Sequence, residues 1–450
     1  MLAPLSVTES DPPMLPGLTL PASLRRLVDA FAECFTAPSF VVFTAMIVGM
    51  IAQTGAKTVC GMLAGAGLAQ RWSHDRVHRF FAGAVWSIDA VGLVVLDLVV
   101  THLLDPDVPV VLAVDDTAHR RRGKKVHGAS WIHDGSAPGR NKLAFGHRWV
   151  IVGVVVHLPF LTRPMCLPVA CRRWQGKGTA STVDLARDMV TLLAARLAGR
   201  TIHVVADAAY HGRQLTDLPE PVTWTTRLPR NATLYGRAPA RTGKRGRPRL
   251  KGDRLGKPAQ VTADLTWQML DVARYGRLAT VRVAVVDCLW YGAFGPQPVR
   301  MICVRDRDDP KAPMLALVTT DPHTTVTALV ARYAMRWSIE VAFFDCRQIL
   351  GVGQARNRTP QAVERTFAFG MYVYSLIVLW YAIAGHKPTI VTERRINAPW
   401  YVSKTDPSFA DMLTALRHTI IAARFMPVRP AQPTHAEIRQ VQRAWALAAA

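Results

Sequence analysis

Acidic residues are scarce in this sequence, and its cysteines show no pairing pattern. The 450 residues hold 32 Asp and Glu against 55 Lys and Arg, which gives a formal net charge of +23. The seven cysteines form no C-x-x-C pair, so they predict neither a disulfide framework nor a zinc site and suit a reducing compartment. Residues 1–21 contain acids and prolines but no basic segment, so we do not expect them to be a secretory signal.

The length and the charge narrow the class of protein. A chain of this length, half of it apolar, has room for two or three domains. So strong a positive charge indicates a polyanionic partner, either nucleic acid or an anionic membrane surface. Residues 34–56 and 366–385 carry no charge, and the second stretch is nearly long enough to cross a bilayer. We interpret both as buried helices, and a membrane protein stays as the alternative.

Two apolar runs end in aspartates. Residues 109–114 are typical of a buried strand and lead into Asp115 and Asp116, while residues 201–206 predict a strand that leads into Asp207. Carboxylates at the end of a central strand point into the crevice where α/β sheets form their sites. The order of three strands, a helix and a further strand predicts an α/β fold with a ribonuclease H-like mixed-sheet core.

A third acidic position lies on a predicted helix. Tyr333, Arg336, Glu340 and Arg347 fall within about 60° of one another at 100° per residue. A carboxylate on this face can bind a metal ion, and arginines can bind phosphate oxygens in a bidentate fork. The alternative is a solvated helix face with i,i+4 ion pairing, which is commoner among helices in general.

The most basic segment lies between the second and third acidic positions. Residues 227–257 hold eleven Lys and Arg and one acid. The centre of the segment, residues 243–249, resembles an AT-hook, which lies along a narrow minor groove. We expect DNA contacts here, and the alternative is a solvated surface loop. The residues proposed to contact DNA are Lys244, Arg245, Arg247 and Arg249.

These patterns divide the chain into five expected regions. We expect a helical N-terminal DNA-binding region, a catalytic core in two parts separated by a basic β-rich insertion, and a helical C-terminal region. The second part of the core carries the Glu340 helix. In chain order the regions are residues 1–106, 107–228, 229–311, 312–386 and 387–450.

The three acidic positions resemble the motifs of the DDE transposases of bacterial insertion sequences. The spacing Tyr333-(2)-Arg336-(3)-Glu340-(6)-Arg347 is similar to the Tyr-(2)-Arg-(3)-Glu-(6)-Lys signature of one group, with Arg in place of the final Lys. Residues 115–117 are similar to the first family motif, and residues 207–210 are similar to the second. Asp115 is favoured over Asp116 in the first motif because Thr117 then follows two residues later, and the choice between them stays open.

The resemblance implies a metal-dependent DNA endonuclease. It implies that Asp115, Asp207 and Glu340 hold two Mg²⁺ ions, which Mn²⁺ can replace, and that the site cleaves transposon ends and transfers them into target DNA. It also implies that Tyr333, Arg336 and Arg347 contact DNA near the cleaved strand.

The resemblance also implies the partners. They are double-stranded DNA, as terminal inverted repeats and as target, and a second copy of the chain in a homodimeric synaptic complex. A cytoplasmic, nucleoid-associated protein with no membrane is expected. Two alternatives remain: a domesticated relative that binds DNA without cleaving it, and a polytopic membrane protein with basic loops.

Overall fold

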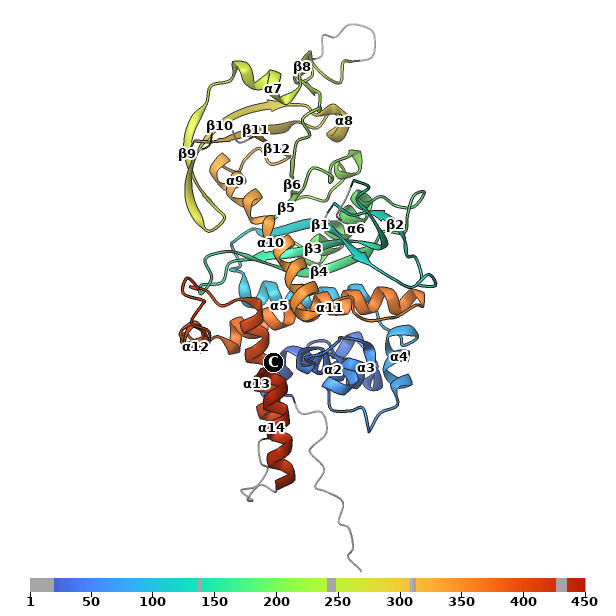
Figure 1. The fold of residues 1–450 in the computed structure, drawn as a ribbon. Coiled ribbons are helices and arrows are strands. Elements are labelled where there is room, and N and C mark those ends of the chain that lie inside the picture. The colour runs from blue at the N-terminus through green and yellow to red at the C-terminus, as the bar shows by residue number, and fades with distance from the viewer. Residues whose placement is uncertain are drawn as a thin grey trace, which may run out of the picture.

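The computed structural model describes residues 20–135, 140–240, 248–307, 309, 313–425 and 435–449. A ten-stranded mixed sheet forms its centre, and helical regions lie at both ends of the chain (Figure 1). The strands are β1 Val110–Arg120, β2 Ser130–His133, β3 Leu143–Val156, β4 Met165–Arg173, β5 Ile202–Ala206, β6 Val222–Arg227, β9 Gln268–Arg274, β10 Arg277–Cys288, β11 Val299–Asp306 and β12 Leu315–Thr319. The predicted α/β class and ribonuclease H-like core are consistent with this architecture.

The sheet is parallel at its centre and antiparallel on either side. Its order is β2-β3-β1-β5-β6-β12-β11-β10-β9, and β4 pairs with β3. β5 is parallel to both β1 and β6, whereas the other pairs in the sheet are antiparallel. All five residues of β5 are buried, as expected of a parallel strand covered on both faces.

The region predicted as an insertion contributes three strands to the same sheet. β9, β10 and β11 join the core strands through β12, which pairs with β6. A small hairpin, β7 Leu234–Tyr235 and β8 Arg254–Gly256, forms a separate two-stranded sheet, and a bridge between Tyr235 and Leu289 joins it to the end of β10. The region boundaries expected from the sequence stay a prediction.

One predicted strand of this region is partly wrong. The composition of residues 261–273 predicts a β-strand, but α7 Pro258–Val261 and the short 3-10 helix η3 Thr262–Asp264 come first. Pro258 stands at the start of α7, where its fixed φ suits a helix and its missing N–H costs no hydrogen bond. The strand therefore begins only at Gln268. A further short helix, α8 Tyr291–Phe294, follows β10.

The N-terminal region is helical, as expected. Aromatic rings bring its helices together: Phe35 stacks on Phe43 with ring centroids 4.4 Å apart, and Phe80 stacks on Trp86 at 5.3 Å. The elements are α1 Ala22–Asp29, the 3-10 helix η1 Ala32–Cys34, α2 Ala37–Ala52, α3 Val59–Gly65, α4 His74–Ala82 and α5 Ile88–Leu103.

The longest apolar helix is buried in the protein. α11 Pro360–Trp380 continues as the π-helix η5 Tyr381–Gly385, and together they are long and apolar enough to cross a membrane. However, 83% of the most apolar window is buried against the rest of the protein. Figure 1 shows α11 between the sheet and the N-terminal helices. The burial agrees with the interpretation of this stretch as a core helix.

The helices that cover the sheet position the site. α6 Thr182–Arg196 packs on β3 and begins with a capping box between Ser181 and Asp184. After β12 the chain forms α9 Val326–Met335, α10 Trp337–Phe344 and the π-helix η4 Asp345–Leu350. Of these helices, α10 packs on β1 and β4.

The C-terminal helices pack back on the N-terminal region. They are α12 Ile390–Asn397, α13 Phe409–Phe425 and α14 His435–Ala449. The Arg417 side chain donates a 2.6 Å hydrogen bond from Nε to the Ile51 carbonyl, and Arg424 donates one of 3.0 Å to the Gly65 carbonyl. These arginines therefore cap the carbonyl ends of α2 and α3.

Candidate active site

The fold places Asp115 beside Asp207. The parallel pairing of β1 with β5 ends at the pair Val114 and Ala206, so the next residue on each strand is an aspartate. Neighbouring strands lie about 4.8 Å apart, so residues 92 positions apart in sequence are brought to adjacent places in the sheet. Asp207 starts a turn in which its Oδ1 accepts a 2.8 Å hydrogen bond from the Ala209 N–H.

The first strand is longer than predicted, which changes the position of its carboxylates. β1 was expected to end at Val114, but it continues to Arg120 through antiparallel pairing with β3. Asp115 and Asp116 therefore lie inside the strand, at the point where only the parallel partner β5 ends. The prediction that these two aspartates lie at the end of their own strand is wrong, because β1 continues past them. They do lie beside the end of the neighbouring strand β5.

One guanidinium joins Asp115 to Glu340. Arg336 donates a 2.9 Å hydrogen bond from Nη1 to Oδ2 of Asp115 and a 2.7 Å bond from Nη2 to Oε1 of Glu340. The carboxylates of β1 and α10 thus lie within the span of a single planar group. The i,i+4 pair of Arg336 and Glu340 is the contact that the solvated-face alternative expected, but it is partly buried and includes a third side chain.

Burial and like charge act on Asp115. Burial raises the pKa of its carboxyl to about 7, the Arg336 guanidinium opposes that rise, and the Asp207 carboxylate adds to it. The pKa of Asp116 is also raised, by burial first and then by Asp207 against the opposing effect of Arg148. Asp207 therefore acts electrostatically on both aspartates of β1.

Asp116 belongs to a different set of contacts. Successive side chains of a strand point to opposite faces, and Asp116 pairs with Arg148 at 3.4 Å, between Oδ2 and Nε. The hydroxyl of the buried Tyr210 also donates to Oδ1 of Asp116, at 3.4 Å. Asp115 is thus the aspartate of this motif that shares Arg336 with Glu340. Sequence reasoning missed Arg148 and Tyr210, although Tyr210 lies within the second motif.

The helix that carries Glu340 is not the continuous α-helix that was predicted. α9 ends at Met335, Arg336 forms a turn, α10 begins at Trp337, and η4 continues as a π-helix from Asp345. α10 is also less amphipathic than expected, because the exposed residues Trp337, Val341 and Phe344 are apolar. A π-helix holds more residues per turn, so even angular spacing does not describe the side chains after Phe344.

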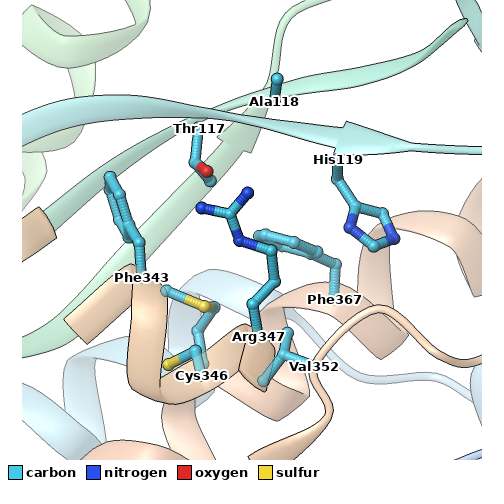
Figure 2. A pocket seen from close by; sticks show the side chains of 9 residues that line it. Thr117, Ala118, His119, Phe343, Cys346, Arg347, Val352 and Phe367 are labelled. Carbon is cyan, nitrogen blue, oxygen red and sulfur yellow. The ribbon is translucent and has the colours of Figure 1, made fainter. Parts of the chain in front are cut away.

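Tyr333 and Arg347 lie in different surroundings. Tyr333 is 9% exposed and packs in a hydrophobic cluster with β10, β11 and α9, and burial raises its pKa. Arg347 lines a small cavity with Thr117, and Figure 2 shows its guanidinium pointing toward that residue. Arg347 therefore lies beside β1 two residues beyond Asp115.

Most of the predicted AT-hook residues cannot be placed. Lys244, Arg245 and Arg247 lie outside the described residues. Arg249 is exposed and forms an ion pair of 2.9 Å with Asp253, an arrangement that contributes little to stability. Its proposed DNA contact stays a prediction.

The carboxylates supply suitable donors for a divalent cation, but they are not arranged around one. Within the described ranges, no group of three His, Cys, Asp or Glu side chains is close enough to hold a metal ion. Arg336 accounts for two of the three proposed ligands because it binds Asp115 and Glu340 itself. Three carboxylates form the all-oxygen donor set that Mg²⁺ prefers. The pKa of Asp115 is raised by burial first and then by the Asp207 carboxylate, and a bound cation would oppose both effects. The donor chemistry therefore fits Mg²⁺, provided that Arg336 moves.

Comparison with known families identifies one match. The model of a family described as DDE superfamily endonuclease matches residues 30–292, which is more than half of the chain. The matched span contains Asp115 and Asp207 and ends before Glu340. No curated protein matches this chain.

Proposed function

Because the chain belongs to the DDE superfamily endonuclease family, we propose that it is the transposase of a bacterial insertion sequence. The proposed reaction is metal-dependent cleavage of the transposon ends and transfer of the freed ends into target DNA. The proposed substrate is double-stranded DNA, and the formal net charge of +23 supports a polyanionic partner.

The observation that carries this proposal is the convergence of Asp115, Asp207 and Glu340. Asp115 and Asp207 follow paired positions of two parallel strands, and Arg336 binds Asp115 and Glu340 together. Sequence motifs separated by more than 200 residues thus meet beside one edge of the parallel sheet. This proximity supports phosphoryl transfer with oxygen-ligated cations, which would require Arg336 to release Asp115 and Glu340.

The proposed ligands are Asp115, Asp207 and Glu340, and the proposed ions are two Mg²⁺, with Mn²⁺ as a substitute. When bound, the ions would activate the attacking water or 3′-hydroxyl and stabilise the leaving oxygen. Tyr210 and Arg148 hold Asp116 on the opposite face, so that Asp115 remains the aspartate of β1 directed at Glu340.

Two arginines supply the proposed phosphate contacts. The guanidinium of Arg336 neutralises two carboxylates here, and its planar fork matches a phosphate equally well. We propose that it exchanges these carboxylates for the DNA backbone when substrate binds. The guanidinium of Arg347 points toward Thr117, which lies two residues beyond Asp115 on β1. From there it would contact the same DNA strand as Arg336.

The substitution Glu340→Gln tests the proposed reaction. It keeps the side chain's size and its hydrogen bond with Arg336 but removes a charged ligand, so nicking of a supercoiled plasmid in Mg²⁺ should fall at least a hundredfold. The plasmid should carry the gene with its flanking DNA, and binding measured in EDTA should be unchanged. Glu393→Gln, an exposed position on α12, is the matched control and should cleave like the wild type.

Two results would contradict the proposal. Cleavage retained by Glu340→Gln would remove Glu340 from the ligand set. DNA binding by the wild type without nicking in either Mg²⁺ or Mn²⁺ would favour a domesticated relative that binds DNA only.

The proposal extends to the assembly and location of the protein. A homodimer that holds two DNA ends in a synaptic complex, in the bacterial cytoplasm and associated with the nucleoid, would perform the reaction. Sedimentation of the wild type with end-containing DNA tests the assembly: one protein copy per complex would contradict it.

A further inference from the structure

A large basic pocket lies where the end of β1 meets the loop after α2 and the segment after α10. It has a volume of about 900 Å³ and is formed by three segments: residues 54–58 after α2, residues 120–126 at the end of β1, and residues 348–358 after α10. Every charged side chain that lines it, within the described part of the chain, is basic. These side chains are Lys57, Arg120, Arg121, Arg122, Arg356 and Arg358.

Lys57 is the most unusual member of this pocket. Its side chain is buried, with 4% of the residue exposed, and among the described residues its Nζ has no hydrogen-bond partner. The backbone N–H of Lys57 donates a 2.7 Å hydrogen bond to Oε1 of Gln354, and its Cγ lies against Gly351. A Cβ at Gly351 would come within 2.7 Å of that Cγ, and Gly351 has a φ of +80°. The absence of a side chain at Gly351 therefore allows the Lys57 side chain to lie directly against the backbone at that position.

An unpaired buried ammonium is costly unless a ligand neutralises it. Burial, together with the Arg417 guanidinium, lowers the pKa of Lys57 to about 7. Arg121 is held at the same loop by hydrogen bonds from Nη1 to the carbonyls of Gly353 and Ala355, at 3.3 and 2.6 Å. The Nε of Arg121 is buried without a partner among the described residues. Two buried donor groups therefore lie in a pocket whose other charges are positive.

The rim of the pocket is wider than a single small anion requires. Arg122, Arg356 and Arg358 are exposed and come from two separate segments. Arginine forks suit phosphate oxygens, and several of them spaced along a groove suit a polymer of phosphates. An extended polyanion can reach both the buried and the exposed charges, whereas one free phosphate would contact only some of them.

The pocket is connected to the candidate active site by β1. The strand runs from Asp115 to Arg120, five residues or about 17 Å. Arg347 and Thr117 lie along this path, in the cavity of Figure 2. At about 3.4 Å per base pair, the same length spans about five base pairs of duplex.

We propose that this pocket binds the sugar–phosphate backbone of DNA about five base pairs from the bond that the carboxylates cleave. The inference rests on the proposed DNA substrate, but it does not depend on cleavage. The site would bind without regard to base sequence, and it would hold the duplex against both the N-terminal helices and β1.

The double substitution Arg356→Ala/Arg358→Ala tests this site. Both side chains are exposed, so the protein should fold normally. The probe is a fluorescent 40-base-pair duplex of random sequence, titrated in EDTA at a series of salt concentrations. Each phosphate contact contributes about 0.9 to the slope of log affinity against log salt, so the slope should fall by about 1.8. Arg439→Ala/Arg443→Ala, with two exposed arginines on α14, removes the same charge elsewhere and should keep the wild-type slope.

A third variant and a competing anion complete the test. Lys57→Met keeps the apolar stem and should lower the slope by about 0.9; if it does not fold, the arginine pair decides alone. An unchanged slope in Arg356→Ala/Arg358→Ala, or an equal fall in the control, would overturn the inference. So would inorganic phosphate binding that this variant loses while its DNA binding stays intact, because the pocket would then take a free anion. If the wild-type protein binds DNA with the expected salt dependence but does not cleave it, the proposed function is contradicted while this binding site is still supported.

Discussion

Replacing Asp115 by Asn should make the protein more stable at neutral pH while removing its activity. The folded pKa of Asp115 is about 7, above its ordinary value of 3.8, because burial and the Asp207 carboxylate disfavour the charged form. The folded protein therefore binds this proton more tightly than the unfolded chain does. As the pH rises from about 4 to about 7, the wild type must bury a charge and loses stability.

The structure sets the size of this effect. A difference between 3.8 and about 7, at 1.36 kcal/mol per pKa unit, corresponds to an upper value of about 4 kcal/mol. The side chain is 15% exposed, so solvent screens it only weakly. Asn is neutral at every pH and avoids this cost, although it binds Arg336 less strongly than a carboxylate does.

Urea unfolding at pH 4.5 and pH 8 measures the prediction. Asp115→Asn should unfold at a higher urea concentration than the wild type at pH 8, and the difference should shrink toward zero at pH 4.5. Asp253→Asn, whose carboxylate is exposed, is the control and should show no such trend. A variant that is less stable than the wild type at pH 8, or an offset that is equal at both pH values, would refute the reasoning.

Three further predictions follow from other contacts. Arg336→Met should cost about 3–5 kcal/mol of unfolding free energy at pH 8, because Asp115 and Glu340 lose a partly buried partner; urea unfolding that stays at the wild-type midpoint would exclude this. Trp224→Ala should lower the unfolding free energy by about 3–5 kcal/mol, since the ring is fully buried and its Nε1 donates a hydrogen bond to the Tyr210 carbonyl. The control Trp131→Ala removes an exposed ring and should change the unfolding free energy by less than about 0.5 kcal/mol. Mg²⁺ should raise the thermal midpoint of the wild type and not that of Asp115→Asn, and equal shifts in calorimetry would place the ion elsewhere.

Much of the fold could be predicted from local patterns. The apolar β-branched runs at residues 109–114 and 201–206 identified the start of β1 and the whole of β5, because buried strands carry that composition whatever their partners. The length of β1 could not be predicted, because residues 115–120 are polar and become a strand only by pairing with β3. Propensity is weak there, and tertiary pairing decides.

The candidate site was predictable in its members but not in its contacts. The spacing around Glu340 and the two strand-associated aspartates named the three carboxylates. Nothing in the spacing showed that Arg336 would bind Asp115, a residue 221 positions away, or that Arg148 and Tyr210 would take Asp116. Lys57 was missed as well, because a lone lysine in a helical region gives no sign of burial in the sequence.

A crystal structure with Mn²⁺ and bound DNA tests the central claim most directly. The account predicts two anomalous peaks about 3.5–4 Å apart, ligated by Asp115, Asp207 and Glu340, with Arg336 turned away from both of its present partners. Peaks bound by other side chains, or an Arg336 that still bridges Asp115 and Glu340 in a complex that cleaves DNA, would contradict it.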